Sequence, residues 1–513
     1  MPSRWILTAT ILASSMAFID GTVVNVALPF LQKELNATVI GVQWIVESYS
    51  LFLSALLLVG GSLGDLYGRR LIFTIGVIVF AVTSIACGFA ANIEQLIIAR
   101  AVQGVGGALL VPGSLAIISA SFTEDKRGQA IGTWSGFSAI TTAIGPLLGG
   151  WLVEHFSWRA VFFLNVPLAL AVVIISIFRI PESKDEEHQG HLDWLGACTA
   201  TLGLGGLVYG LIESPRLGLS NPLVIATLVG GVLALLLFLW NEARSRNPMV
   251  PLGLFRSRNF AGANLLTLLL YAAIGALFFF LSLNLVQVQK YSATAAGAAL
   301  LPFVVFMFVL SRWSGGLVDR FGSRLPLVIG PFIAAGGFLL FAVPGVGAHY
   351  FSGFLPAILT VGFGMAVTVA PLTTTVMNSV SQEQAGVASG INNAVSRTAG
   401  LLAIAIFGVV MLVWFSRALD RRLAQLPLDE GVKQSVLEQR VKLGGIQLPE
   451  SFGTNNKDSV ASAIDEAFVE GFRLLMLISA GLAAGSGLIS WALIRSHAPA
   501  TSQHGDQPAE KKA

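Results

Sequence analysis

Residues 61–70, GSLGDLYGRR, end one long apolar segment of the chain and begin the next. A second version of this stretch, GGLVDRFGSR at residues 315–324, separates two later apolar segments. Each version follows the second apolar segment of a block of six. A unit repeated in this way predicts two related halves, and many secondary transporters place their binding site between such halves.

The composition is that of a membrane protein. The 513 residues are 54% hydrophobic and only 12% charged, with a mean hydropathy of +0.76. Soluble domains carry about 25% charge, so an ordinary soluble enzyme and a disordered chain are both excluded. Apolar runs of about 20 residues are long enough to cross a bilayer, and in lipid they must be helical to satisfy their backbone.

We predict an all-α polytopic membrane protein with fourteen transmembrane helices, arranged as two pseudo-symmetric six-helix bundles plus two inserted helices. The predicted spans are 5–27, 42–63, 71–91, 93–117, 128–152, 160–180, 193–213, 221–240, 260–282, 294–316, 326–345, 353–376, 387–413 and 471–494. The corresponding domains are 1–185 for the first bundle, 186–245 for the inserted helices, 246–495 for the second bundle, and 496–513 for a disordered cytoplasmic tail.

The segment 414–470 is the one sizeable polar piece between spans. Leu419, Leu423 and Leu426 recur in it at helical spacing. An amphipathic surface helix and a lid over the outer vestibule are both compatible with this pattern. A solvated extracytoplasmic connector is the interpretation that we favour.

The distribution of basic residues predicts the orientation. With both termini in the cytoplasm, the inner segments carry sixteen Lys and Arg, whereas the short outer loops carry only Lys33, Arg159, Arg216 and Lys290. The first apolar run lacks a small-residue cleavage site, so we expect it to be retained as a span. The net charge of +3 is too small and too dispersed to indicate nucleic-acid binding. We therefore expect a multi-pass protein of the cytoplasmic (inner) membrane, and a monomer.

Four further stretches sharpen the picture. They are Asp20–Pro29 (DGTVVNVALP), Arg100–Gly106 (RAVQGVG), Gly145–Gly150 (GPLLGG) and Trp158–Pro167 (WRAVFFLNVP). Together with residues 61–70, they resemble the signatures of the major facilitator superfamily, and in particular its fourteen-span drug:proton antiporter branch. The resemblance covers the N-terminal half densely and the C-terminal half loosely. It implies two rocking bundles and the exchange of protons for exported compounds.

Four ionisable residues fall inside predicted spans: Asp20, Glu47, Arg100 and Arg397. Such residues are costly in a membrane and usually functional. At 1.5 Å per residue, Asp20, Glu47 and Arg100 all lie in the outer half of the membrane, so a carboxylate–guanidinium cluster is feasible. Burial disfavours an ionised carboxyl whereas a nearby guanidinium favours it, and such a balance suits a proton-exchange site.

We predict that Asp20 and Glu47 exchange protons, that Arg100 tunes them, and that Asn25, Gln103 and Arg397 complete the proton and substrate site. The alternatives are a static ion pair for Asp20, an outward face exposed to water for Glu47, and simple packing for Arg397.

The repeated stretch predicts a cytoplasmic gate. Asp65 and Arg69 are four residues apart and can pair on a helical turn, to latch the outward-facing state and to break when the inner gate opens. The predicted gate comprises Gly61, Asp65, Gly68, Arg69, Arg70, Asp319 and Arg320. Ordinary topology-setting charge is the alternative, because an exposed pair contributes only about 0–1 kcal/mol.

The glycines of the third stretch are spaced for close helix packing. We expect Gly145, Pro146, Gly149 and Gly150 to form a tight helix interface, and the resemblance adds a role as a seal that favours exchange.

The energy source is expected to be an ion gradient. No P-loop is present for ATP, and no HExxH, paired CxxC or GxSxG pattern indicates an enzyme, a metal site or any other cofactor. Cys87 and Cys198 are predicted to be small core residues.

We expect a proton-driven exporter of small hydrophobic or cationic compounds, in contact with protons and membrane lipids. An exporter of an endogenous metabolite, lipid or siderophore is the first alternative. A receptor or scaffold on a transporter fold is the second.

Overall fold

A computed structural model describes residues 2–184, 193–245, 248–381, 384–448 and 454–495. Within these ranges the chain is helical and has no β-strand, which confirms the predicted fold class. Thirteen helices of the described residues are long and apolar enough to cross a membrane. Helix α5 (Glu124–His155) lies among them as a fourteenth long helix.

The first bundle is formed by the helices that match the first six predicted spans. They are α1 (Pro2–Glu34), α2 (Val39–Tyr67), α3 (Arg69–Gly88), α4 (Ile93–Ser121), α5, and the pair α6 (Ala160–Phe163) and α7 (Asn165–Arg179). The inserted helices are α8 (Trp194–Leu217) and α9 (Pro222–Arg244). Helix α9 leaves large apolar side chains such as Leu233, Leu236 and Trp240 exposed, as suits a surface that faces lipid.

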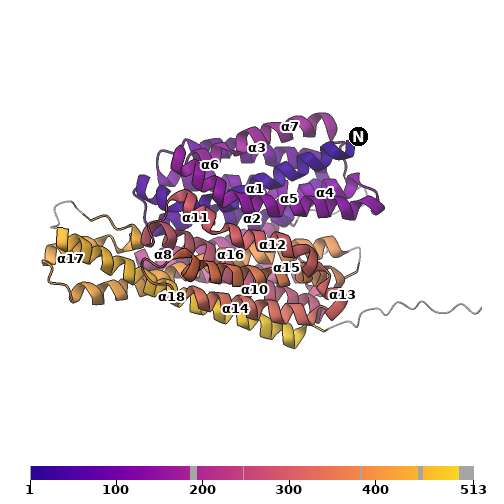
Figure 1. Cartoon of the computed structure of the whole chain (residues 1–513). Coiled ribbons are helices and arrows are strands. Elements are labelled where there is room, and N and C mark those ends of the chain that lie inside the picture. Colours follow the sequence, from indigo (N-terminus) through magenta and orange to yellow (C-terminus); the bar gives the residue numbers. More distant parts are fainter. Residues whose placement is uncertain (1, 185–192, 246–247, 382–383, 449–453, 496–513) are drawn as a thin grey trace, which may run out of the picture.

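The second bundle contains the remaining helices. They are η1 (Leu252–Arg256), α10 (Arg258–Leu283), η2 (Asn284–Val288), α11 (Ala293–Ala299), α12 (Leu301–Gly315), α13 (Leu317–Phe321), α14 (Arg324–Phe341), η3 (Tyr350–Phe354), α15 (Leu355–Asn378), α16 (Ala385–Ala424), α17 (Glu430–Glu438), η5 (Arg440–Gly445) and α18 (Thr454–Leu493). Figure 1 shows the two bundles side by side, with the N-terminus at one end of the molecule and α17 at the other. We call these ends the terminal face and the cap face.

The prediction that 414–470 is a solvated connector is wrong at both ends of the segment. Helix α16 continues without a break to Ala424, and α18 begins at Thr454. Each helix has 40 residues, or about 60 Å, which is twice the thickness of the hydrocarbon layer. Leu419 and Leu423 are buried because they belong to a helix that packs on α18, and not to a surface helix. Ion pairs of Arg421 with Glu470 (2.6 Å) and of Arg422 with Glu466 join the two extensions.

The hydrophobic core is distributed unevenly between the two faces. One cluster joins both bundles near the cap face, where Val24, Leu28 and Leu31 of α1 are buried in the same cluster as Leu277 and Leu281 of α10. The fully buried members of a second cluster, towards the terminal face, come from the first bundle alone. Apart from a smaller cluster that joins α2 and α8 to α16, the bundles are therefore held together mainly at the cap face.

Hydrogen bonds between the bundles follow the same distribution. Wherever both partners are described residues, these bonds lie near the cap face, as in Gln287 Nε2 to Gln32 Oε1 (2.8 Å) and Gln32 Nε2 to the Lys442 carbonyl (2.9 Å). The η5 segment thus covers the end of α1, which is the part of the lid interpretation that the structure supports.

The remaining predictions concern the two cysteines and the C-terminal tail. Cys87 is buried as expected, whereas Cys198 is exposed on α8, so the prediction of a core residue is wrong for Cys198. The predicted disordered tail, 496–513, lies outside the described residues.

Candidate functional site

A buried ion pair forms the centre of the candidate site. Asp20 on α1 is 0% exposed and Arg100 on α4 is 1% exposed, and the Arg100 guanidinium contacts the Asp20 carboxylate directly. Arg100 Nε also donates to the Ile45 carbonyl at 3.2 Å, and the guanidinium lies 4.2 Å from the centre of the Tyr49 ring. The predicted pairing of α1 with α4 is confirmed.

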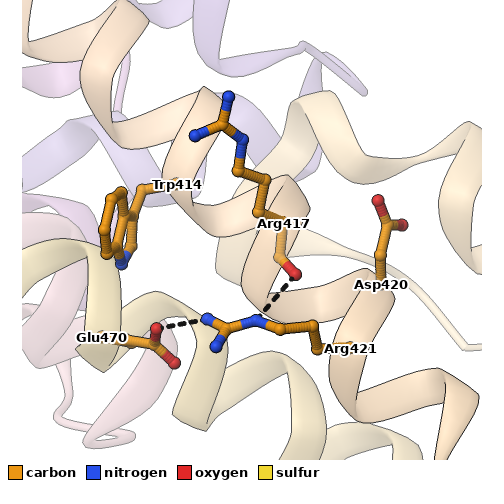
Figure 2. A pocket seen from close by; sticks show the side chains of 5 residues that line it. All are labelled: Trp414, Arg417, Asp420, Arg421 and Glu470. Atoms are coloured by element: carbon orange, nitrogen blue, oxygen red, sulfur yellow. Dashed lines mark hydrogen bonds and ion pairs between the residues drawn. The ribbon is translucent and has the colours of Figure 1, made fainter.

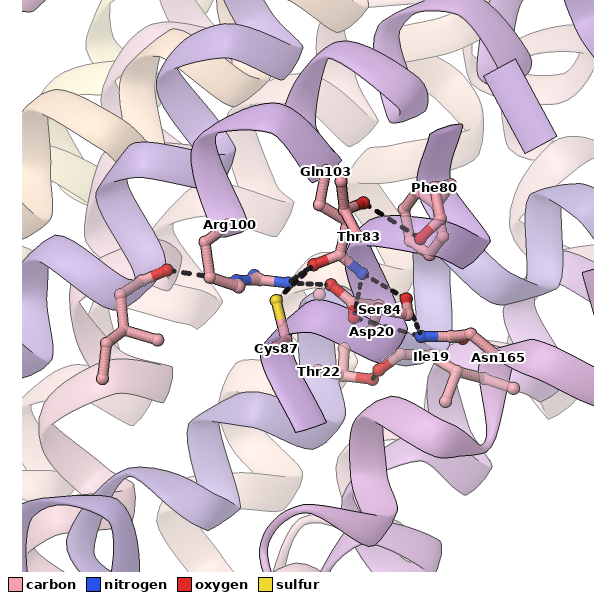
Figure 3. A network of polar contacts seen from close by, with 12 residues as sticks. Ile19, Asp20, Thr22, Phe80, Thr83, Ser84, Cys87, Arg100, Gln103 and Asn165 are labelled. Carbon is pink, nitrogen blue, oxygen red and sulfur yellow. Dashed lines mark hydrogen bonds and ion pairs between the residues drawn. The ribbon is translucent and has the colours of Figure 1, made fainter. Parts of the chain in front are cut away.

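A ring of polar side chains completes the pair (Figure 3). Gln103 accepts a hydrogen bond from Arg100 at 2.7 Å and donates to Asp20 Oδ1 at 3.0 Å and to Ser84 Oγ at 2.8 Å. Asn165 Nδ2 donates to Asp20 at 3.3 Å and to Ser84 at 3.2 Å. The buried carboxylate therefore has donors from α4 and α7, the kind of arrangement that makes a buried charge tolerable.

Sequence reasoning missed Ser84 and Asn165 as site residues. Asn165 lies in the Trp158–Pro167 stretch that was singled out above, so a signal for it existed. Ser84 lies in α3 among apolar residues and has no comparable signal.

The prediction that Glu47 joins this cluster is wrong. Glu47 is fully buried, which also excludes the outward, water-facing alternative. Neither carboxyl oxygen has a hydrogen-bond partner among the described residues. Because successive helical residues are rotated by about 100°, Glu47 and Tyr49 point in nearly opposite directions, and it is Tyr49 that faces Arg100. One turn away, Gln43 donates to the Ile404 carbonyl of α16 at 2.9 Å, which places Glu47 on the side of α2 that faces the second bundle.

A cavity of about 410 Å³ lies between the two bundles, next to the ion pair. Its lining residues come from α1, α2 and α4 on one side and from α10 and α16 on the other: Ala17, Phe18, Gly21, Thr22, Val24, Asn25, Val46, Tyr49, Ser50, Arg100, Tyr271, Asn393, Ser396 and Arg397. Arg397 Nε donates to Asn393 Oδ1 at 3.2 Å. The structure thus brings the predicted residues Asn25, Arg100 and Arg397 to one cavity, with Asp20 directly behind Arg100.

A second hollow of about 480 Å³ lies on the extensions of α16 and α18 (Figure 2). Its lining residues are Trp414, Arg417, Asp420, Arg421 and Glu470, and Arg421 is held by Glu470 and by the Arg417 carbonyl. Both helices belong to the same bundle. This hollow is therefore not bounded by both bundles, whereas the cavity next to the ion pair is.

The repeated stretch forms two similar corners. The Asp65–Arg69 pair is present, with 2.8 Å between Arg69 Nη2 and Asp65 Oδ1. Gly68 has φ +118° and Gly322 has φ +71°, a left-handed backbone that favours glycine and explains why both copies keep it. A Cβ atom added to Gly61 would lie 3.7 Å from the Cβ atom of Pro112 on α4.

The gate residues have partners within the first bundle. The backbone N–H of Arg70 donates to Glu182 at 3.0 Å, and its side chain donates to the Ile180 carbonyl at 3.2 Å, so both contacts are made beyond the end of α7. The Asp65–Arg69 pair is intact in this structure, in which the cap face is closed. The pair is therefore not by itself a latch for the state that is open at the cap face. In the second copy Arg320 is exposed, and the Asp319 side chain is not among those that the structure describes.

The stretch Gly145–Gly150, which we call the antiporter motif after the branch it resembles, packs tightly as predicted. Side chains on Gly145 and Gly149 would collide with Thr22 and Val23 of α1, and α5 runs unbroken through Pro146. Gly150 lies against the backbone of Ala293 in α11 of the second bundle, and Gly297 of α11 lies against the Pro146 carbonyl. The motif therefore forms two helix interfaces, one within the first bundle and one between the bundles.

These features define a class: a polytopic membrane transporter whose cavity lies between two helical bundles. The family comparison agrees, because the model of the Major Facilitator Superfamily matches residues 10–404. The chain belongs to this superfamily.

Several relatives are similar along most of the chain. The "Multidrug resistance protein Stp" of Mycobacterium tuberculosis (strain CDC 1551 / Oshkosh) is 34% identical over 94% of this chain and 91% of its own length. The "Tetracenomycin C resistance and export protein" of Streptomyces glaucescens is 31% identical over 93% and 89%. These names agree with the drug-exporting branch that the motifs resemble.

Solved structures support the fold. A bacterial homologue of the human lysosomal transporter Spinster, in an inward-facing and unoccupied conformation, superposes with a TM-score of 0.68. The sequences are 16% identical, and the superposition covers 97% of this chain and 99% of that one.

Proposed function

We propose that this chain exports small hydrophobic compounds from the cell in exchange for protons. The observation that carries the proposal is the position of Asp20, which is buried on Arg100 one side chain away from the cavity between the bundles. The names of the relatives support the export of antibiotic-like compounds. In this proposal the terminal face lies on the cytoplasmic side of the cytoplasmic (inner) membrane, and the cap face lies on its outer side.

Proton exchange would act through the ion pair. A proton on Asp20 removes the charge that holds Arg100, and the guanidinium, which already contacts Tyr49 and lines the cavity, is then free to move away from α1. Gln103 and Asn165 remain as neutral donors and keep the protonated carboxyl in place. Loss of the proton restores the ion pair. In this scheme Arg100 reports the protonation state of Asp20 to the cargo site.

The available driving force is sufficient for export. Moving one charge through 100 mV supplies about 2.3 kcal/mol. Each tenfold concentration gradient costs about 1.4 kcal/mol. A proton-motive force of ordinary size therefore sustains a gradient of a hundredfold or more. The protein would act as a monomer in contact with membrane lipids.

The test uses purified protein in lipid vesicles with a proton gradient. Neutral, cationic and anionic fluorescent compounds are offered, and transport is followed before and after nigericin and valinomycin collapse the gradient. We expect the movement of at least one compound to stop. If every compound moves at an unchanged rate after the collapse, the proton-exchange proposal fails; if no compound moves at all, a scaffold role is favoured.

A further inference from the structure

The cavity between the bundles has an unbalanced charge. Two guanidiniums, Arg100 and Arg397, are among its lining residues, whereas none of its described lining residues is acidic. Asp20 neutralises Arg100 from behind. One positive charge, that of Arg397, is left over.

Arg397 lacks a carboxylate partner among the residues that the structure describes. Its hydrogen bond goes to the neutral amide of Asn393 at 3.2 Å, and the side chain is half-buried at the wall of the cavity. A guanidinium removed from bulk water and left without a counter-charge favours an anion, and its planar fork fits a carboxylate with two parallel hydrogen bonds.

The surroundings of Arg397 suit an anion attached to an apolar body. Ser396 and Asn393 lie beside it on α16, and the Tyr49 hydroxyl has no hydrogen-bond partner among the described residues. Phe18 and Val46 supply apolar wall on the opposite bundle. A volume of about 410 Å³ is within the range of ordinary small-molecule sites.

We propose that the cargo of this cavity is an organic anion, a hydrophobic compound whose carboxylate or phenolate binds Arg397. This inference rests on the proposed export function and names its cargo class, and it departs from the cationic compounds that the sequence suggested. The potential of a cell that is negative inside also favours the outward movement of an anion, by about 2.3 kcal/mol per charge and 100 mV.

The sign of the coupling follows from the same charges. A proton on Asp20 leaves Arg100 without its counter-charge, so the cavity then carries two positive charges near an anionic cargo. Protonation should tighten the binding of an anion and weaken that of a cation. For exchange, the cargo must therefore leave on the outside before a proton loads Asp20, because a site that held both would carry the cargo back inward.

The experiment compares dansyl-glycine, which carries a carboxylate, with dansyl-glycinamide, its neutral counterpart of the same size. Binding to the purified full-length protein is measured by fluorescence polarisation at pH 7.5, in wild type, Arg397→Gln, Arg397→Lys and Asp20→Asn. Arg256→Gln, at an exposed arginine of η1, is the matched control. Thermal unfolding of each variant verifies that it is folded.

We expect wild type to bind the acid about tenfold more tightly than the amide, as one charge-assisted hydrogen bond would give. Arg397→Gln should abolish this preference by weakening the binding of the acid much more than that of the amide, and Arg397→Lys should restore part of it. Binding of the acid should be tighter in Asp20→Asn than in wild type, because the amide leaves Arg100 without its counter-charge.

Equal affinities for the two compounds, or no binding of the acid, would overturn the proposal, as would an equal loss for both in Arg397→Gln. Vesicle transport then separates the two hypotheses. If the amide is exported in a gradient-dependent manner and the acid is not, the export function stands and the anionic cargo class fails.

Discussion

The two bundles hold their polar groups in different ways. In the first bundle a carboxylate and a guanidinium compensate each other within a buried network. In the second bundle the corresponding network is neutral, because Asn392 donates to Asn264 at 3.1 Å and to Thr267 at 2.8 Å, and the one charge at the cavity, Arg397, stands without a described counter-ion.

This difference suggests a division of labour. A compensated pair has two states, joined and separated, and one proton switches between them. A neutral network has no such switch and holds its helices at any pH. An unpaired charge at the cavity wall attracts a ligand. The first bundle is therefore suited to proton coupling, and the second to cargo recognition.

The largest effect is expected when the Asp20 carboxyl, the group proposed to exchange protons in the first bundle, is removed. Asp20→Asn should abolish gradient-dependent efflux, because an amide of the same size cannot exchange a proton at neutral pH. Transport is measured in vesicles with an imposed proton gradient, after quantifying the protein in the membrane. Asp420→Asn, at an exposed carboxyl on the α16 extension, is the matched control and should transport normally. Normal coupling in Asp20→Asn would refute the role assigned to the first bundle.

The next largest effect should be on stability. Arg100→Gln leaves the Asp20 carboxylate buried without its ionic partner, which typically costs about 3–5 kcal/mol. The double variant Asp20→Asn/Arg100→Gln removes both charges and should recover most of the lost stability, yet not the coupling. Thermal unfolding in detergent measures both. If the double variant is as unstable as the single one, packing and not charge governs this site.

A third prediction concerns the interface that joins the bundles. Gly150→Leu places a side chain against the Ala293 backbone of α11, so the closed cap face should be disfavoured and turnover should fall severalfold. Gly230→Leu is the control, because that glycine of α9 has open space around it. Labelling of a cysteine introduced at Gln287 reports cap-face opening; unchanged labelling in Gly150→Leu would contradict the role of this contact.

The sequence was sufficient for the number of spans, the repeat and the pairing of Asp20 with Arg100. Hydropathy sets the spans, and residue count along a helix sets depth. The depth of a residue in the membrane does not fix its rotation about the helix axis, however. Glu47 was placed in the cluster from its depth alone, and its rotation about the α2 axis turns it away from Arg100. The 40-residue helices α16 and α18 were missed because their extensions are polar, and a hydropathy pattern cannot distinguish a helix in water from a loop.

The smallest effect on stability is expected at the repeated stretch. Asp65 and Arg69 are partly exposed, and such a pair contributes about 0–1 kcal/mol, so Asp65→Asn should hardly change the unfolding temperature. Its expected effect is kinetic: slower turnover with unchanged cargo affinity, because the corner between α2 and α3 moves with the terminal face and does not line the cavity. Steady-state transport and equilibrium binding separate the two quantities. A change in affinity alone would mean that the corner between α2 and α3 acts on the cargo site. Cargo binding would then involve the first bundle as well, and the division of labour between the two bundles would no longer hold.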